Sequence, residues 1–154
     1  MDLTNDLELK GNELITLLGS AGFNAKLTAL IAEKKNTVPL PPFVSRVYGW
    51  SSREVELPAL HVLGLREELI KDEGTCRWQW FKYTLEVYAG GDDKEVLERI
   101  TNRYARAIDE ILIETYRDNG LRTNIDYSPV LRYEDNLFKA CSIQFQIKVF
   151  QDLT

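Results

Sequence analysis

The chain has 154 residues, of which 44% are hydrophobic and 28% are charged, and a formal net charge of -5 at pH 7. This length suits one domain with a sizeable core, and the composition is ordinary for a globular protein. The negative charge argues against a general nucleic-acid binder, which usually has a strong basic excess. No apolar run approaches the ~20 residues of a membrane span, and Met1-Asp2-Leu3 does not begin a signal peptide. We therefore expect a cytoplasmic protein where it is made, with no membrane partner.

Residues 1–35 predict a helical hairpin. Leucine and isoleucine recur at helical spacing from Leu7 to Leu18, and Gly19-Ser20-Ala21-Gly22 ends this first helix. Asn24 is placed to cap a second helix that continues to Lys35. Both helices are amphipathic, so the hairpin must pack on an apolar surface elsewhere in the chain.

Residues 36–52 form an irregular segment rich in proline and aromatic residues. Pro39, Pro41 and Pro42 exclude a central strand and favour extended backbone. One interpretation is a loop that packs its aromatic side chains on the core. The other is an arm that binds a partner, with Trp50 at the contact, because exposed aromatic residues concentrate at interfaces.

The next stretch predicts a strand followed by a long connection. Glu54 to Val62 alternates like a strand, and Pro58 places it at a sheet edge or a bulge. Gly64 to Thr75 contains the charged run Arg66-Glu67-Glu68 and is too long for a tight turn. We expect this stretch to be the mobile tip of a β-hairpin, with Arg66, Glu67 and Glu68 contacting a partner.

The clearest pattern runs from Arg77 to Arg117. Residues alternate between an apolar and a polar face from Trp78 to Ala89, as in a half-buried strand. Gly90-Gly91 predicts a reversal through positive φ, and Asp92 predicts a helix N-cap with Glu95 completing a capping box. The following helix has one broad apolar stripe, formed by Val96, Ile100, Tyr104, Ala107, Ile108 and Ile111.

The last part of the chain predicts a second hairpin. Asn119-Gly120 ends the long helix, and residues 121–133 show a strand pattern interrupted by Pro129. Glu134-Asp135-Asn136 turns the chain, and Leu137 to Phe150 alternates strictly. We predict a single α+β domain over residues 1–154, with an antiparallel or mixed curved sheet and helices packed on one face. Residues 1–35 supply the helical hairpin, 36–52 the arm or loop, and 53–154 the sheet with its central helix.

Two features of this central unit are candidates for binding. Trp78 and Trp80 lie on the strand face opposite the apolar one, where a solvent-exposed sheet face does not normally carry two tryptophans. Either a loop or another subunit covers them, and we favour a subunit. Arg99, Arg103 and Arg106 form a ridge beside the apolar stripe. This ridge is either a solvated face paired with glutamates or a basic strip facing a partner or passing DNA.

No phosphate-binding loop, nucleophilic serine motif or Cys/His metal motif is present in the sequence. Asp92 and Asp93 could form a carboxylate pair, but helix capping already accounts for them. We therefore expect no enzymatic activity, no cofactor and no metal.

Several short motifs carry a resemblance to a known family. They are Leu57-Pro58-Ala59-Leu60-His61-Val62, Trp80-Phe81-Lys82-Tyr83-Thr84-Leu85-Glu86-Val87-Tyr88, Gly91-Asp92-Asp93-Lys94-Glu95-Val96 and Arg103-Tyr104-Ala105-Arg106-Ala107-Ile108. Together with the order of elements from Leu14 to Phe150, they resemble the tail terminator and tail completion (tail-to-head joining) proteins of long-tailed bacteriophages. Residues 36–52 have no counterpart in this resemblance.

The resemblance implies a structural virion protein. Such a protein forms a ring, typically of six subunits, that caps the tail tube, ends its polymerisation and meets the head-side connector, while DNA passes through the lumen without sequence-specific binding. The implied partners are other copies of the chain, the tail tube protein and a head-side neck protein. The implied location is the head-proximal end of the virion tail, after assembly in the host cytoplasm.

Two alternatives remain from the sequence. One is another neck component, such as a head-completion or connector-adaptor protein. The other is a small nucleic-acid-processing accessory enzyme that would use the arginine ridge together with Asp92 and Asp93.

Overall fold

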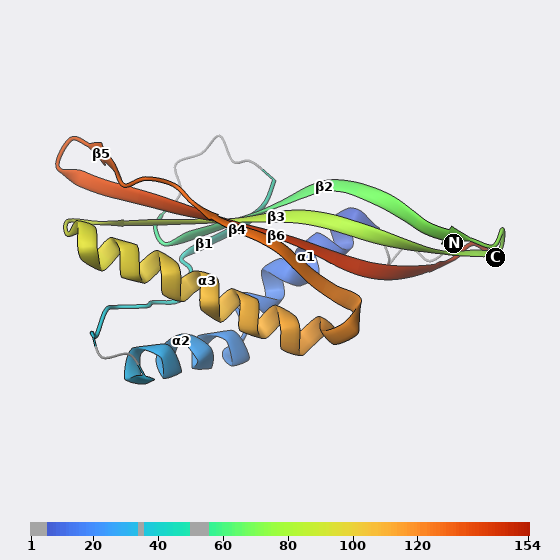
Figure 1. The fold of residues 1–154 in the computed structure, drawn as a ribbon, viewed down its shortest axis with the longest axis horizontal. Coiled ribbons are helices and arrows are strands. Elements are labelled where there is room, and N and C mark those ends of the chain that lie inside the picture. The colour runs from blue at the N-terminus through green and yellow to red at the C-terminus, as the bar shows by residue number, and fades with distance from the viewer. Residues whose placement is uncertain (1–5, 34–35, 50–55) are drawn as a thin grey trace.

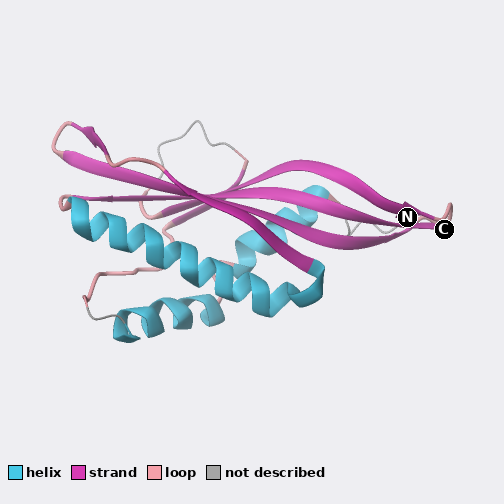
Figure 2. Cartoon of the chain, in the orientation of Figure 1, coloured by secondary structure: helices cyan, strands magenta, loops and turns pink. Residues whose placement is uncertain are grey.

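A computed structural model describes residues 6–33, 36–49 and 56–154 (Figures 1 and 2). The helices are α1 (Leu7–Leu17), α2 (Ala21–Glu33) and α3 (Lys94–Tyr116), with a short 3-10 turn, η1 (Arg117–Asn119). The strands are β1 (Ser45–Tyr48), β2 (Ala59–Asp72), β3 (Cys76–Gly91), β4 (Gly120–Tyr127), β5 (Leu131–Tyr133) and β6 (Asn136–Asp152).

The strands form one mixed sheet with helices on one face. The order is β1-β2-β3-β6-β4, and β5 pairs with β6. β1 runs parallel to β2, whereas the other pairs are antiparallel. Figure 1 shows α3 lying along the sheet, α2 packed on α3 further from the sheet, and α1 beneath the β1–β2 side. The predicted α+β class with helices packed on one face is confirmed.

The core lies between β3, β6 and α3. Phe81, Tyr83, Leu85 and Val87 of β3 are fully buried, as the alternation predicts. The facing residues of β6 are equally enclosed, because the two strands pair without interruption over their whole length. Burying an apolar side chain of this size stabilises the fold by roughly 1.5–3 kcal/mol. The shared cluster includes Ile100, Ala107, Ile108, Ile111, Ile143, Phe145 and Ile147.

Residues 36–44 pack on this core. The ring of Phe43 stacks between Phe23 of α2 and Tyr104 of α3, with centroid separations of 5.7 and 5.0 Å. The Tyr104 hydroxyl donates a hydrogen bond of 2.5 Å to the Pro41 carbonyl. The packed-loop interpretation therefore holds for residues 36–44. The next residues of the segment form the strand β1, which the irregular pattern did not predict. Trp50 lies outside the described residues.

The tip of the β2–β3 hairpin differs from the prediction. β2 continues through the charged run to Asp72, and β3 begins at Cys76, so the connection is Glu73–Thr75. The predicted long loop from Gly64 to Thr75 is therefore wrong. Alternation fails here because no helix covers this end of the sheet, so that strand residues on both faces are exposed.

Both helix N-caps also differ from the prediction. The Ser20 hydroxyl, not Asn24, accepts a hydrogen bond from the Phe23 N–H (3.2 Å), so α2 begins four residues earlier than expected. Asp93 caps α3 in place of Asp92, accepting from the Val96 N–H at 3.1 Å. A capping box that starts at Asp93 needs Glu or Gln at position 96, where the chain has Val96. The shift of one residue therefore removes the predicted capping box.

The glycines expected to reverse the chain also behave differently. Gly90 and Gly91 belong to β3, and neither has positive φ. At Gly90 a Cβ would lie 2.9 Å from Leu57 Cδ1, so glycine permits a close approach there. α3 ends at Tyr116, before the predicted stop at Asn119-Gly120, and Arg117 leaves the helix with φ 48°.

We expect Asp93→Ala to lower the free energy of unfolding by about 0.5–2 kcal/mol, because the first turn of α3 loses its side-chain acceptor. Asp92→Ala is the matched control, since Asp92 does not cap the helix, and its effect should stay within about 0.5 kcal/mol. Urea denaturation measures both. A larger effect at Asp92 than at Asp93 would contradict the observed cap.

Candidate interaction surface

Three strands extend beyond the helix layer. We call this projection the arm and define it as residues 66–72, 76–80 and 148–152; it is not the arm predicted for residues 36–52. β1 pairs with Ala59–Val62 of β2, and β4 reaches Ile147 of β6, so neither strand borders the arm. Figure 1 shows the arm tapering away from the helices towards the C-terminus. The arm is a projection of the sheet, and Val149 on its helix-side face joins it to the core cluster.

One face of the arm carries an aromatic patch, which we define as Trp78, Trp80 and Phe150. These residues alternate with the buried apolar ones, so they lie on the sheet face opposite the helices. The rings of Trp78 and Phe150 are 5.1 Å apart, and Phe150 is 41% exposed. The Lys148 ammonium lies 5.1 Å from the Trp78 ring centroid, a cation–π arrangement. The predicted face of both tryptophans is thus observed, and their cover by another subunit stays a prediction.

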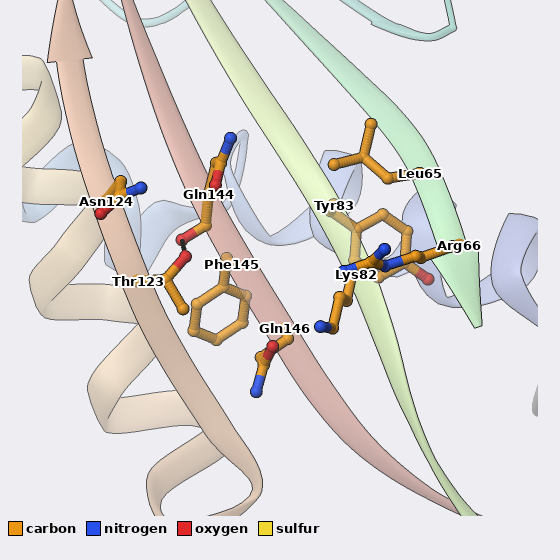
Figure 3. A pocket seen from close by; sticks show the side chains of 9 residues that line it. All are labelled: Leu65, Arg66, Lys82, Tyr83, Thr123, Asn124, Gln144, Phe145 and Gln146. Atoms are coloured by element: carbon orange, nitrogen blue, oxygen red, sulfur yellow. Dashed lines mark hydrogen bonds between the residues drawn. The ribbon is translucent and has the colours of Figure 1, made fainter. Parts of the chain in front are cut away.

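A polar trough lies beside this patch on the same face (Figure 3). Its volume is about 560 Å³, and it crosses β2, β3, β6 and β4. The described lining contains two cations and no carboxylate. It consists of Leu65, Arg66, Lys82, Tyr83, Thr123, Asn124, Gln144, Phe145 and Gln146.

The predicted contact run 66–68 is divided between the two sheet faces. Arg66 pairs with Lys82 and Glu68 with Trp80, which places both on the trough side, whereas Glu67 pairs with Phe81 and lies on the other face. Glu68 is 2.8 Å from the Lys82 ammonium and 3.7 Å from Arg66. The hydrogen bond from Lys82 lowers the pKa of the Glu68 carboxyl. Two cations share this one carboxylate, which leaves the rim of the trough positively charged.

The arginine ridge is not a continuous basic strip. Arg103 is 7% exposed and donates through Nη2 to the Asn36 carbonyl at 2.5 Å, because residues 36–44 cross over it. Arg99 pairs with Glu95 at 2.6 Å, and Arg106 is held at 2.9 Å by the acid four residues later, Glu110. The ion-paired interpretation describes these contacts. Of the residues proposed for a nucleic-acid enzyme, Asp93 caps α3, and the three arginines are engaged in ion pairs or in packing. Asp92 is exposed just before the helix.

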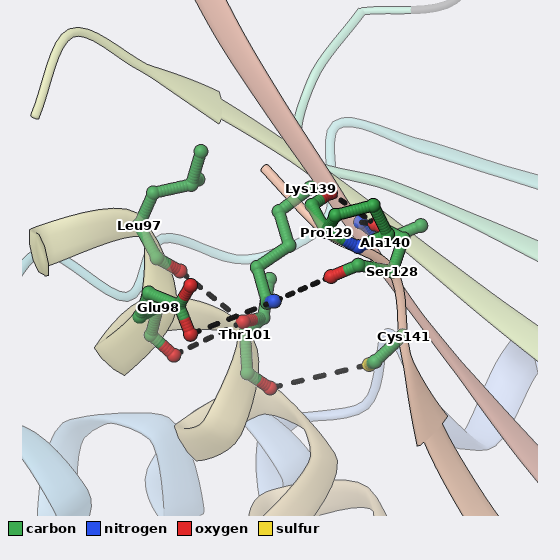
Figure 4. Close-up of polar contacts among 8 residues, drawn as sticks. All are labelled: Leu97, Glu98, Thr101, Ser128, Pro129, Lys139, Ala140 and Cys141. Carbon is green, nitrogen blue, oxygen red and sulfur yellow. Dashed lines mark hydrogen bonds and ion pairs between the residues drawn. The ribbon is translucent and has the colours of Figure 1, made fainter. Parts of the chain in front are cut away.

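A buried lysine fixes the opposite end of the sheet (Figure 4). Lys139 is 6% exposed, and its ammonium donates to the Ser128 carbonyl at 2.5 Å and lies 3.5 Å from the Glu98 carboxylate of α3. The Ser128 hydroxyl in turn accepts from the Ala140 N–H at 2.9 Å. Sequence reasoning missed this contact, although position 139 falls on the inward register of β6. Lys139 ties the start of the β5–β6 hairpin to the helix layer.

Beyond this contact the hairpin tip projects into solvent. We define the hairpin tip as residues 131–136, all of which are exposed. Leu131 is 58% and Tyr133 is 70% exposed, and Glu134 takes a φ of 56° in the turn. Figure 1 shows β5 on the side of β6 away from the helices, which is also the side of the trough.

The described side chains and helices also bear on metal binding and membrane insertion. Within residues 6–33, 36–49 and 56–154, no group of three or more His, Cys, Asp or Glu side chains could hold a metal ion. No single described helix is long and apolar enough to cross a membrane, although α1 and α2 together, bent by 46°, reach the required length and composition. Cys76 and Cys141 are free thiols, and burial raises the pKa of Cys141 to about 12.

One of the solved structures to which this chain is similar is a virion chain. No family model matches the sequence, and no curated protein does. The solved structure is a chain of the "Virion of native gene transfer agent (GTA) particle", 12% identical, with a TM-score of 0.33 over 87% of this chain and 98% of that chain. A likeness at this level does not define a function.

Proposed function

We propose that the protein is a structural virion-assembly protein, a tail terminator whose subunits form a ring that caps the tail tube and joins it to the head connector. The ring has six subunits and closes around the passing DNA, without catalysis or a cofactor. The proposal combines the resemblance of the sequence motifs with the arm and its aromatic patch.

The aromatic patch is the observation that carries this proposal. Trp78, Trp80 and Phe150 lie on the sheet face without helices, so these large apolar groups contribute little to the central core. Aromatic side chains at such positions are the usual anchors of protein interfaces. A heterologous contact that repeats by rotation either closes into a ring or continues as a filament, and a cap has to close.

The paired state of the arginine ridge favours this proposal over the accessory-enzyme alternative. Each ridge guanidinium already contacts a carboxylate or a backbone carbonyl within the subunit. The Asp93 carboxylate in addition accepts a hydrogen bond from the first turn of α3. Tail-length control distinguishes a terminator from another neck component, because a neck component leaves tail length unchanged.

We expect Trp80→Ala to fold normally yet to fail in ring formation and to leave tails of uncontrolled length. Truncating an interface anchor typically costs about 2 kcal/mol or more, roughly a 30-fold weaker contact. Light scattering after size-exclusion chromatography measures ring formation, and electron microscopy of tails assembled with the variant measures their length.

The matched control is Ile113→Ala, which truncates an apolar side chain of α3 that is 57% exposed and lies outside the arm. This variant should form rings and give tails of normal length. Normal tails with Trp80→Ala would show that the tryptophans serve the subunit's own fold and would remove the observation on which the proposal rests.

A further inference from the structure

We propose that the hairpin tip of one copy of the chain docks into the polar trough of the next copy. This inference rests on the proposed ring and names the two surfaces that meet at each of its contacts. Because the two surfaces differ, the contact is heterologous and can repeat around a closed ring.

Charge complementarity identifies the occupant. The trough and its rim hold Arg66 and Lys82 against the single carboxylate of Glu68. The hairpin tip carries two adjacent acids, Glu134 and Asp135, at its turn and one cation, Arg132, on β5, so two acids and one cation give it a net charge of -1. Within the described part of the chain, no ion pair involves Glu134 or Asp135. Bringing the turn over the trough would place these acids beside the excess positive charge. Complementary charges of this kind fix the register of a contact and steer its formation.

The polar lining suits a hairpin turn in a second respect. Thr123, Asn124, Gln144 and Gln146 offer side-chain hydroxyl and amide groups to the trough (Figure 3). Such groups can donate to and accept from the exposed backbone groups of a turn, which need hydrogen-bond partners once water is excluded. A purely apolar groove would leave those groups unsatisfied.

Apolar contact continues from the trough onto the arm. Trp80 lies two residues before Lys82 on the same strand face, so the trough opens onto the aromatic patch. The hairpin tip exposes Leu131 and Tyr133 next to its acids. The tip can therefore place its carboxylates over the cations and its apolar side chains against the patch. Lys139 supports this arrangement by holding the base of the hairpin to Ser128 and the helix layer.

The first test reverses one charge of the tip. Asp135→Lys should weaken subunit association about tenfold or more, as light scattering over a concentration series measures with and without tail tubes. Asp92→Lys makes the same change at an exposed acid of the neighbouring β3–α3 turn and should leave association unchanged. Adding Arg66→Glu to Asp135→Lys should restore association, because the opposite charges then face each other again. Failure of that restoration, with both proteins folded, would count against the contact.

The second test is a cross-link that reports proximity directly. Asp135→Cys and Gln144→Cys are made in separate proteins, each with Cys76→Ser, and the two proteins are mixed under oxidising conditions. We expect a disulfide-linked dimer from this pair. A mixture in which Ala29→Cys, an exposed position of α2, replaces Gln144→Cys should give none.

The outcomes separate this inference from the proposed function. The tip-in-trough contact would be overturned, and the proposed ring left intact, by two results together. The Asp135→Lys protein would form rings as well as the wild type does, and Asp135→Cys would cross-link equally to cysteines at positions 144 and 29. A wild-type protein that forms no ring with or without tail tubes would overturn the proposed function, and the contact with it.

Discussion

Phe145→Ala is expected to lower the free energy of unfolding by about 3–5 kcal/mol, because it leaves a cavity between the sheet and the C-terminal end of α3. Phe145 is 2% exposed, and its ring lies 5.6 Å from that of Tyr116 at the end of the helix. It also lies where β4 begins, since a Cβ on Gly120 would come within 2.6 Å of its ring. A loss of this size is a large share of the ~5–15 kcal/mol that stabilise a typical domain.

Urea denaturation followed by circular dichroism measures the effect, and Phe150→Ala provides a matched control on the same strand. Phe150 faces away from the helices and is 41% exposed, so its truncation should cost less than about 1 kcal/mol. Equal losses for the two variants would show that the two faces of β6 are not divided as the structure has them.

Alkaline pH is expected to unfold the protein through its buried tyrosines. Burial raises the pKa of Tyr83, Tyr104 and Tyr116 well above the ordinary value of 10.0. Above that value the unfolded chain releases the phenolic protons while the folded chain retains them, so stability falls as pH rises. Each tyrosine contributes about 1.4 kcal/mol of lost stability per pH unit until its folded pKa is reached. Below about pH 10 these groups leave stability unchanged, because both states are protonated.

The measurement is urea denaturation at a series of pH values from about 9 to about 12, with phenolate absorbance recorded in parallel. Tyr83→Phe should flatten the decline by about 1.4 kcal/mol per pH unit, since one phenol no longer titrates. This variant also loses the hydrogen bond of 2.7 Å from the Tyr83 hydroxyl to the Leu7 carbonyl. The loss of this hydrogen bond lowers stability equally at every pH, so the change in slope reports only the missing phenol. A constant free energy of unfolding up to about pH 12 would contradict the burial of these hydroxyls.

Periodic patterns predicted the elements whose two faces have different environments. One face of β3 and β6 is covered by α3 and the other is open, so their inward residues are mostly apolar and their outward residues are largely polar. The outer half of β2 has no helix beneath it, and its charged sequence therefore suggested a loop. β1 was missed because it is short and is held by parallel pairing with β2, a partner that local sequence does not reveal.

The candidate site was only partly predictable for the same physical reason. Strand alternation placed Trp78 and Trp80 on the outward face, where the structure has them. Helical spacing put Arg103 in a solvated ridge, but residues 36–44 cover it through a contact 67 positions away in the chain. The polar trough combines residues from four strands, and no local pattern brings such residues together.

The two register shifts of β2 have a consequence for the free chain. Beyond Val62 the outer edge of β2 has no described strand beside it, and Leu69 and Ile70 are exposed there. Such an edge is a template for cross-β stacking between chains. The irregularities between Gly64 and Arg66 and between Leu69 and Lys71 interrupt its hydrogen-bonding repeat, so an incoming flat strand meets no continuous ladder. The free chain can therefore accumulate while avoiding the growth of amyloid-like fibrils from its own arm.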